Sequence, residues 1–172
     1  GYDNLPTTLP VMNMTDGVLT PKQSKEQLIR HTLVDLGLHE TLTYTLTSEA
    51  TVNEFNLFHS LDNTVKLMSP LGEERSAARK SLIGSLLQTI HYNNAHSNKD
   101  VNIFEIANTY SDKEVSNLAI AVSGDYVNVP WMGKKEAVDF YLVKGFVETL
   151  FKKLCIEESR YTFEKVEADN KD

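Results

Sequence analysis

Cysteine is nearly absent from this sequence of 172 residues, and glycine never clusters. The one cysteine, Cys155, cannot form an internal disulfide and has no second thiol with which to bind zinc. We therefore interpret it as a small apolar group on a helix, in a protein of a reducing cytoplasm. Because the eight glycines lie far apart, the usual glycine-rich loop that cradles phosphate groups is also missing.

Basic residues are in the minority, and long apolar runs are lacking. The chain has 17 Lys and Arg against 24 Asp and Glu, a net charge of -7, and no basic run that would attract polyphosphate locally. No stretch approaches the roughly 20 apolar residues of a membrane span, and the N-terminus lacks the order of a signal peptide. These absences favour a soluble, cytoplasmic protein with no membrane contact, and they disfavour a general nucleic-acid binder.

A metal site is equally disfavoured. The five histidines include no pair four residues apart on a predicted helix, and His91 and His96 lie about 140° apart around a helical wheel. We expect no metal ligands and no cofactor-binding residues in this chain.

The composition that is present, 41% apolar and 24% charged, is typical of one globular domain. We predict an extended, proline-punctuated arm over residues 1–19, arriving from a preceding domain, and a folded domain over 20–172. The first residue is not Met, which suggests a piece of a longer polypeptide.

The first helix is predicted over residues 21–36. Thr20 as N-cap, Pro21 at the first helical position and Gln23 form a capping box. Gly37 can take the left-handed conformation that ends a helix. A broad aliphatic arc follows from the helical spacing of Leu28, Ile29, Leu33 and Leu36.

A strand with one buried face is predicted over 40–46, because Leu42, Tyr44 and Leu46 alternate with threonines. Shorter elements follow: a helix from Ser48 to about residue 55, and a strand over 64–68.

Ser81 is predicted to cap a third helix, whose buried face is formed by Leu82, Ile83, Leu86, Leu87 and Ile90. Strands are predicted over 101–110, over 117–124 as a central strand buried on both faces, and over 160–166. A last helix over about 137–154 has one apolar arc formed by Phe140, Val143, Val147, Leu150, Phe151 and Leu154. This order of elements predicts an α+β domain with a mostly antiparallel sheet flanked by helices.

Two groups of carboxylates are candidates for chemistry. Glu73 and Glu74 could act as an acid/base pair, but adjacent carboxylates in a turn are more often solvated or paired with a nearby arginine such as Arg75 or Arg79. Glu105 lies inside an apolar strand, where a buried carboxylate needs a donor. The alternative is that Glu105 points to the face opposite its apolar neighbours.

Several motifs in one order carry a resemblance: "LTPKQSKEQLIRHTLVDLGLHETLTYTL", "MSPLGEERSAARKSLIGSLL", "NKDVNIFEIA" and "DFYLVKGFVETL". Together they resemble the catalytic-like region of the β subunit of bacterial phenylalanyl-tRNA synthetase, over nearly the whole chain. The resemblance implies a class II synthetase-like fold, truncated at its C-terminus. It also implies that 21–36 and 40–46 form the motif used for subunit contact, so Leu28, Ile29, Leu33 and Leu36 are the candidate interface.

In active class II enzymes an arginine after the strand that corresponds to 101–110 holds the ATP phosphate. Here no arginine lies between Arg79 and Arg160, and Lys113 cannot reproduce the paired hydrogen bonds of a guanidinium. The resemblance therefore implies no catalytic residue in this chain. We expect Glu74, Arg79, Ser81 and Glu105 to have a structural, bracing role.

The implied function is a non-catalytic core domain that pairs with the catalytic α subunit. The parent complex would be an (αβ)₂ phenylalanine–tRNA ligase in which ATP, Mg²⁺, phenylalanine and tRNA(Phe) are handled mainly by α. Two alternatives stay open: an active ATP-dependent ligase domain, and a tRNA-contacting module. We also expect the isolated chain to self-associate through its uncovered apolar surface.

Overall fold

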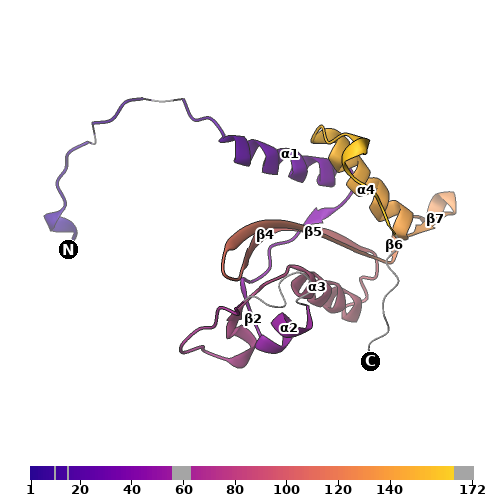
Figure 1. The fold of residues 1–172 in the computed structure, drawn as a ribbon, viewed down its shortest axis with the longest axis horizontal. Helices are drawn as coiled ribbons and strands as arrows, with labels where there is room; N and C mark the ends of the chain where they lie inside the picture. The colour runs from indigo at the N-terminus through magenta and orange to yellow at the C-terminus, as the bar shows by residue number, and fades with distance from the viewer. Residues whose placement is uncertain (10, 15, 56–62, 165–172) are drawn as a thin grey trace.

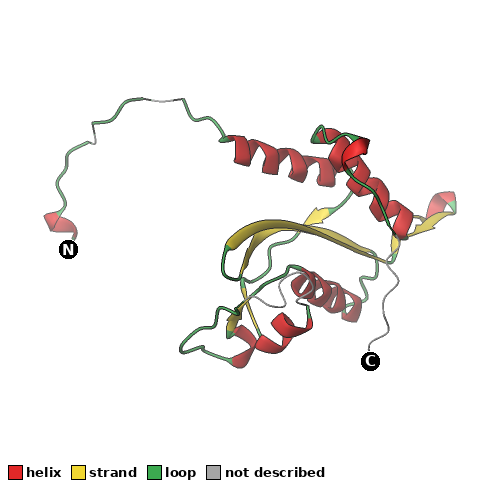
Figure 2. Cartoon of the chain, in the orientation of Figure 1, coloured by secondary structure: helices red, strands yellow, loops and turns green. Residues whose placement is uncertain are grey.

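A computed structural model of the chain describes residues 1–9, 11–14, 16–55 and 63–164. At its centre is a three-stranded sheet in which β4 (Val101–Tyr110) pairs antiparallel with β5 (Glu114–Ser123) and parallel with the short β1 (His39–Glu40). The α+β fold with helices flanking a mainly antiparallel sheet is confirmed (Figure 2). The prediction that the strand over 117–124 is central was wrong, because β4 occupies the centre and β5 is an edge strand among the described residues.

Helices cover both faces of this sheet (Figure 1). On one face, α1 (Pro21–Asp35) and α4 (Phe140–Lys153) enclose a cluster formed by Leu33, Leu38, Phe104 and Phe146. On the other face, α3 (Ile83–Ala95) encloses a cluster formed by Leu86, Val101 and Ile103. Because successive side chains of β4 alternate between these faces, both faces of the strand are buried.

The first helix begins and ends as predicted from its capping residues. The backbone N–H of Gln23 donates to the Thr20 hydroxyl at 3.3 Å, and the Gln23 side chain accepts from the Thr20 N–H at 2.9 Å. Gly37 follows the helix with a φ of +82°, the left-handed conformation that favours glycine. Residues 1–9, 11–14 and 16–19 extend away from the domain in Figure 1, with one turn of 3₁₀ helix at Tyr2–Asn4.

The strand predicted over 40–46 is not continuous. Pairing is limited to β1 and to β2 (Leu46–Thr47), which pairs antiparallel with β3 (Ala77–Ala78), and residues 41–45 have no regular element. The predicted buried face is also reversed, since Leu42 and Tyr44 are 85% and 72% exposed. The reason is a tertiary contact: the N–H of Thr43 donates to the side chain of Glu105, 62 residues away, rather than to a neighbouring strand.

The following elements agree in part with the sequence. Ser48 caps α2 (Glu49–Glu54), as predicted, through its hydroxyl. The strand predicted over 64–68 is reduced to a single bridge between Lys66 and Ala77. A 3₁₀ turn, η2 (Glu73–Arg75), lies between this segment and β3.

The third helix starts slightly later than predicted. Leu82 is the N-cap residue of α3, and the Ser81 hydroxyl still accepts a hydrogen bond from the N–H of Ile83 at 3.1 Å. Leu87, predicted to lie on the buried face, is 43% exposed. The small residues Gly84 and Ser85 are buried instead, and Gly84 lies against the side chains of Thr51 and Phe55.

The C-terminal part differs most from the sequence prediction. A hairpin of β6 (Asp125–Val129) and β7 (Lys134–Ala137), closed by η3 (Pro130–Met132), precedes α4, which is capped by Asp139. Within α4 the predicted arc is displaced, since Phe140 is 65% exposed and Phe146 only 3%.

Cys155 lies just beyond α4, exposed and with a positive φ, rather than on a helix. The strand predicted over 160–166 is absent from its described part: η4 (Glu158–Arg160) is followed by irregular backbone over 161–164. Residues 165 and 166 lie outside the described residues.

Candidate functional site

Arg79 and Glu105, predicted as bracing residues, meet in the interior. The Nη1 atom of Arg79 lies 3.0 Å from Oε1 of Glu105, and their side chains are 4% and 1% exposed. Thr43 completes the arrangement: its N–H donates to Oε1 and its hydroxyl to Oε2 of Glu105, at 3.1 and 2.7 Å. Arg79 also donates to the Thr43 hydroxyl at 2.7 Å and to the backbone carbonyl of Asn108 at 3.1 Å.

This buried network joins three segments that are distant in sequence. Glu105 lies on the α3 side of β4, opposite Phe104, so the direction expected from the sequence is correct, but that face is covered as well. The carboxylate receives its donors from the 41–45 segment and from the segment before α3. Since a buried charge is costly unless paired and hydrogen-bonded, the network fixes both segments to the central strand.

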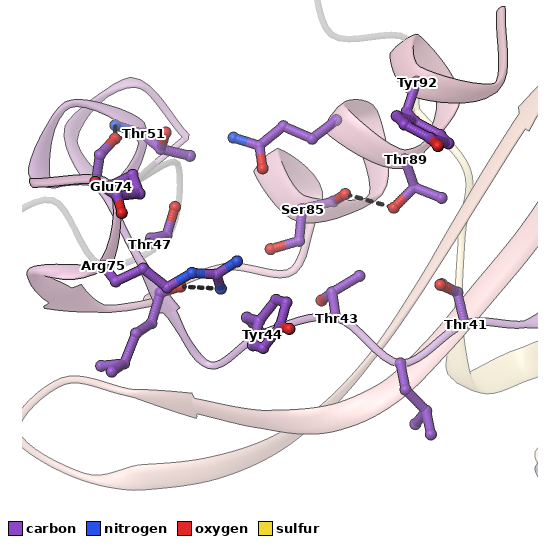
Figure 3. A pocket seen from close by; sticks show the side chains of 14 residues that line it. Thr41, Thr43, Tyr44, Thr47, Thr51, Glu74, Arg75, Ser85, Thr89 and Tyr92 are labelled. Atoms are coloured by element: carbon purple, nitrogen blue, oxygen red, sulfur yellow. Dashed lines mark hydrogen bonds between the residues drawn. The ribbon is translucent and has the colours of Figure 1, made fainter. Parts of the chain in front are cut away.

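Beside this network lies an open cavity of about 420 Å³, between the 41–51 segment, η2 and α3 (Figure 3). At one end the guanidinium of Arg75 lies 3.5 Å from the ring centroid of Tyr44. Arg75 donates one long hydrogen bond, 3.4 Å, to the carbonyl of Leu46. Hydroxyl and amide groups from α3 form the opposite wall, contributed by Ser85, Gln88, Thr89 and Tyr92.

The chemistry of this cavity is that of binding rather than of proton transfer. Glu74 lines it and Glu73 does not, so the two carboxylates considered as an acid/base pair are not brought together there. Among the described residues neither side-chain carboxylate forms a salt bridge, whereas the backbone carbonyl of Glu73 accepts from the Ser76 hydroxyl. The residues that the sequence prediction missed are Tyr44, Arg75 and Ser85, whose proximity depends on tertiary structure.

The candidate interface on α1 is only partly at the surface. Leu33 is completely buried in the chain's own core, so it is unavailable to a partner and its assignment as an interface residue needs correction. Ile29 and Leu36 are half-buried against the same cluster. Leu28 is 39% exposed, and Val34, which the sequence analysis did not select, is 50% exposed. The helix faces its own sheet with the side that the arc predicted for a partner.

Electrostatic anchoring also occurs at the corner after β5. The N–H of Asp125 and the amide of Asn128 donate to Asp100, and these bonds lower the pKa of its carboxyl below the usual value. Across the hairpin, the hydrogen bond and charge of Asp125 raise the pKa of Lys135.

Within the described ranges no group of three metal-ligating side chains occurs, and no helix is long and apolar enough to cross a membrane.

Comparison with known proteins identifies the family. Residues 5–171 match the family described as "Phenylalanyl tRNA synthetase beta chain CLM domain". The chain is 38% identical over 167 residues to the phenylalanine–tRNA ligase beta subunit of Staphylococcus aureus strain Mu50, covering 92% of this chain and 21% of that protein. It is 38% identical over 165 residues to the Staphylococcus epidermidis beta subunit, covering 91% and 20%. The chain thus spans about a fifth of the length of these relatives.

Two solved structures with a similar fold are aminoacyl-tRNA synthetases. A pyrrolysyl-tRNA synthetase of Desulfitobacterium hafniense aligns with a TM-score of 0.58 and 16% identity, covering 80% of this chain and 46% of that one. A histidine–tRNA ligase subunit of Alicyclobacillus acidocaldarius aligns with a TM-score of 0.58 and 13% identity, covering 88% and 43%. At these identities the likeness establishes a class II synthetase-like fold alone, whereas the match over residues 5–171 shows that the chain belongs to the phenylalanyl-tRNA synthetase β chain CLM domain family.

Proposed function

We propose that this domain is a non-catalytic, subunit-pairing part of a phenylalanine–tRNA ligase. The observation that carries the proposal is the exposure of Leu42 and Tyr44, at 85% and 72%. Their alternation with threonines encodes an apolar face, yet in the described part of the chain most of its surface is uncovered, although the Arg75 guanidinium stacks on the Tyr44 ring. An apolar face left open beside a folded core is typical of an interaction surface.

Two further apolar side chains, in the turn before Arg75, are exposed as well. Met68 and Leu71 are fully exposed, and the carbonyl of Gly72 accepts from the N–H of Arg75, which stacks on Tyr44. We call Leu42, Tyr44, Met68 and Leu71 the pairing surface. Each of these side chains would contribute about 1.5 to 3 kcal/mol if fully covered, before the entropy of association is subtracted.

The partner in this proposal is the α subunit, because the relatives are named as beta subunits. Within such a complex, phenylalanine, tRNA(Phe), ATP and Mg²⁺ would be handled mainly by α. In isolation the pairing surface would be satisfied weakly by a second copy of the chain. We therefore also expect slow, concentration-dependent self-association of the domain.

The pairing role can be tested with two exposed tyrosines. Tyr44 lies on the pairing surface and Tyr141 lies on α4, and they are 72% and 75% exposed. Tyr44→Asp should weaken binding to the α subunit about 10-fold or more, because interface aromatics contribute strongly and a carboxylate must then be desolvated. Tyr141→Asp is the matched control and should bind like the parent. If both variants and the parent bind the α subunit with equal affinity in a calorimetric titration, the pairing surface is assigned wrongly.

The absence of catalysis is the second part of the proposal. No arginine follows β4 before Arg160, and Arg79 already donates to Glu105 in the interior. A triphosphate would therefore find no paired guanidinium donor in the segment after β4, where active class II enzymes are expected to have one. We predict that the isolated chain shows no micromolar affinity for ATP with Mg²⁺ in a calorimetric titration. Measurable micromolar binding would favour the alternative of an active ligase domain.

A further inference from the structure

Arg75 differs from the other arginines that contact the domain core. Arg30 donates to Glu40 at 2.8 Å, and Arg79 donates to Glu105 at 3.0 Å. Arg75 is half-buried and has a backbone carbonyl at 3.4 Å and an aromatic ring, but no carboxylate among the residues that the structure describes. Guanidinium groups form their strongest interactions with planar carboxylates through two parallel N–H donors. Arg75 therefore has unused capacity for such a partner.

Ser85 supplies a second, independent observation in the same cavity. The residue is only 8% exposed and lines the cavity, and within the described ranges its backbone carbonyl accepts from the Thr89 hydroxyl while its own hydroxyl makes no hydrogen bond. Figure 3 shows this hydroxyl turned away from α3, toward the end of the cavity where Arg75 and Tyr44 lie. Because this hydroxyl lines an open cavity that solvent can enter, it is free to donate to or accept from a ligand there.

We propose that this cavity receives the carboxylate of one Asp or Glu side chain of the partner subunit, held by Arg75 and Ser85. A carboxylate is favoured over a phosphate because Glu74 lies in the same cavity and the chain carries a net charge of -7. A dianion would be repelled more strongly than a single charge. The planar carboxylate also matches the guanidinium, which Tyr44 holds flat by stacking.

The source of the carboxylate follows from the position of the cavity. Leu42 and Tyr44 line it and are also members of the pairing surface, so a partner that covers that surface reaches the cavity mouth. One guanidinium and one hydroxyl hold a free small carboxylate poorly, because the whole loss of translational freedom opposes binding. A side chain on an already docked partner avoids most of that loss. This inference rests on the proposed pairing function.

The test compares the affinity of four variants for the α subunit in calorimetric titrations. Arg75→Gln should weaken pairing about 30-fold, since it removes one member of a covered charge pair. Ser85→Ala should weaken it roughly 10-fold through one hydrogen bond to a charged group. Arg160→Gln, in η4, makes the same change in charge on an exposed arginine and should bind within about two-fold of the parent. Arg75→Lys should stay weakened, because an ammonium lacks the fork.

Each outcome decides the inference. If the parent pairs with α and the Arg75→Gln and Ser85→Ala variants pair with the same affinity as the parent, the proposed carboxylate site is wrong. The proposed pairing function then stands. If the parent does not pair with α, both fall. Sodium acetate added to the isolated domain should give no saturable shift of the Arg75 side-chain NMR signals below about 10 mM. Saturation at micromolar acetate would show that the cavity binds a free carboxylate. The proposal that it receives a side chain of the partner subunit would then be wrong. Circular dichroism of each variant confirms that it is folded.

Discussion

Two arginines, four residues apart in the chain, have opposite surroundings. Arg79 is 4% exposed and donates three hydrogen bonds, one of them to the buried carboxylate of Glu105. Arg75 is half-buried at the edge of an open cavity, with one hydrogen bond of 3.4 Å and the face of Tyr44. The same side chain is therefore used for internal stability at one position and is left with free donors at the other.

The difference shows how a rigid interior can support a binding surface. The buried network of Arg79 and Glu105 holds Thr43 by both its N–H and its hydroxyl. With Thr43 fixed inward, its neighbours Leu42 and Tyr44 are directed outward, toward the cavity and the proposed partner. Positioning by a supporting layer of hydrogen bonds is a general requirement of precise binding sites. Disrupting the buried network of Arg79 and Glu105 should therefore also disturb the cavity that contains Arg75. Substituting Arg75 should leave the buried network intact.

The largest effect is expected in the apolar interior that supports both regions. Leu33 is fully buried, so Leu33→Glu places an unpaired charge in the core and should unfold the domain. Leu28→Glu, on the same helix at a position 39% exposed, should leave it folded. Circular dichroism with urea titration distinguishes them. A folded Leu33→Glu variant would show that α1 does not pack on the sheet as described.

The second largest effect on stability is expected from the buried pair of Arg79 and Glu105. Glu105→Gln leaves Arg79 buried without its counter-charge and should lower the free energy of unfolding by about 3 to 5 kcal/mol. Glu74→Gln makes the same change on an exposed carboxylate and should alter stability by less than about 0.5 kcal/mol. Both values come from urea denaturation. Once assembled with α, the Glu105→Gln chain should support aminoacylation at close to the normal rate. A large loss of turnover with normal stability would contradict its bracing role.

Patterns of neighbouring residues in the sequence predicted the helix cap and the central strand correctly. Thr20 and Gln23 form the capping box that their spacing indicates, and β4 has the predicted bounds of 101–110. The need of Glu105 for a donor was also predictable, because an apolar strand rarely carries an unpaired carboxylate. That the donor is Arg79, 26 residues away, follows only from the meeting of two segments in space.

The predictions that failed are those about which face of a strand or helix the domain buries. Alternation in 40–46 indicates two different sides but does not say which one the domain buries, and the hydrogen bonds of Thr43 place Leu42 and Tyr44 outside. For the same reason an aliphatic arc on α1 could be assigned to a partner although one of its members, Leu33, lies in the chain's own core. The cavity itself had no sequence signal, since Arg75 and Ser85 come from separate elements.

A smaller effect on stability is expected at Arg75, the arginine at the edge of the cavity. Arg75→Gln removes a cation–π contact and a long hydrogen bond at a half-buried position, so the isolated domain should lose less than about 1 kcal/mol of stability. Its thermal midpoint, measured by circular dichroism, should stay close to that of the parent. Destabilisation as large as that of Glu105→Gln would mean that Arg75 is a structural residue like Arg79, and the contrast between the two regions would fail.

The smallest effect is expected at Asp100, a surface carboxylate that accepts two hydrogen bonds, whereas the buried Glu105 accepts three. The N–H of Asp125 and the amide of Asn128 lower the pKa of Asp100 below its ordinary value of 3.8. A carboxyl whose pKa is lower in the folded state stabilises the fold above its unfolded pKa, and this contribution is lost as the pH falls through the folded pKa. Asp100→Asn should therefore be slightly less stable than the parent at pH 7, and the difference should shrink as the pH is lowered below about 4. Urea denaturation of both proteins across this range checks the sign. A difference that grows with acidification would show that the hydrogen bonds to Asp100 favour the neutral acid.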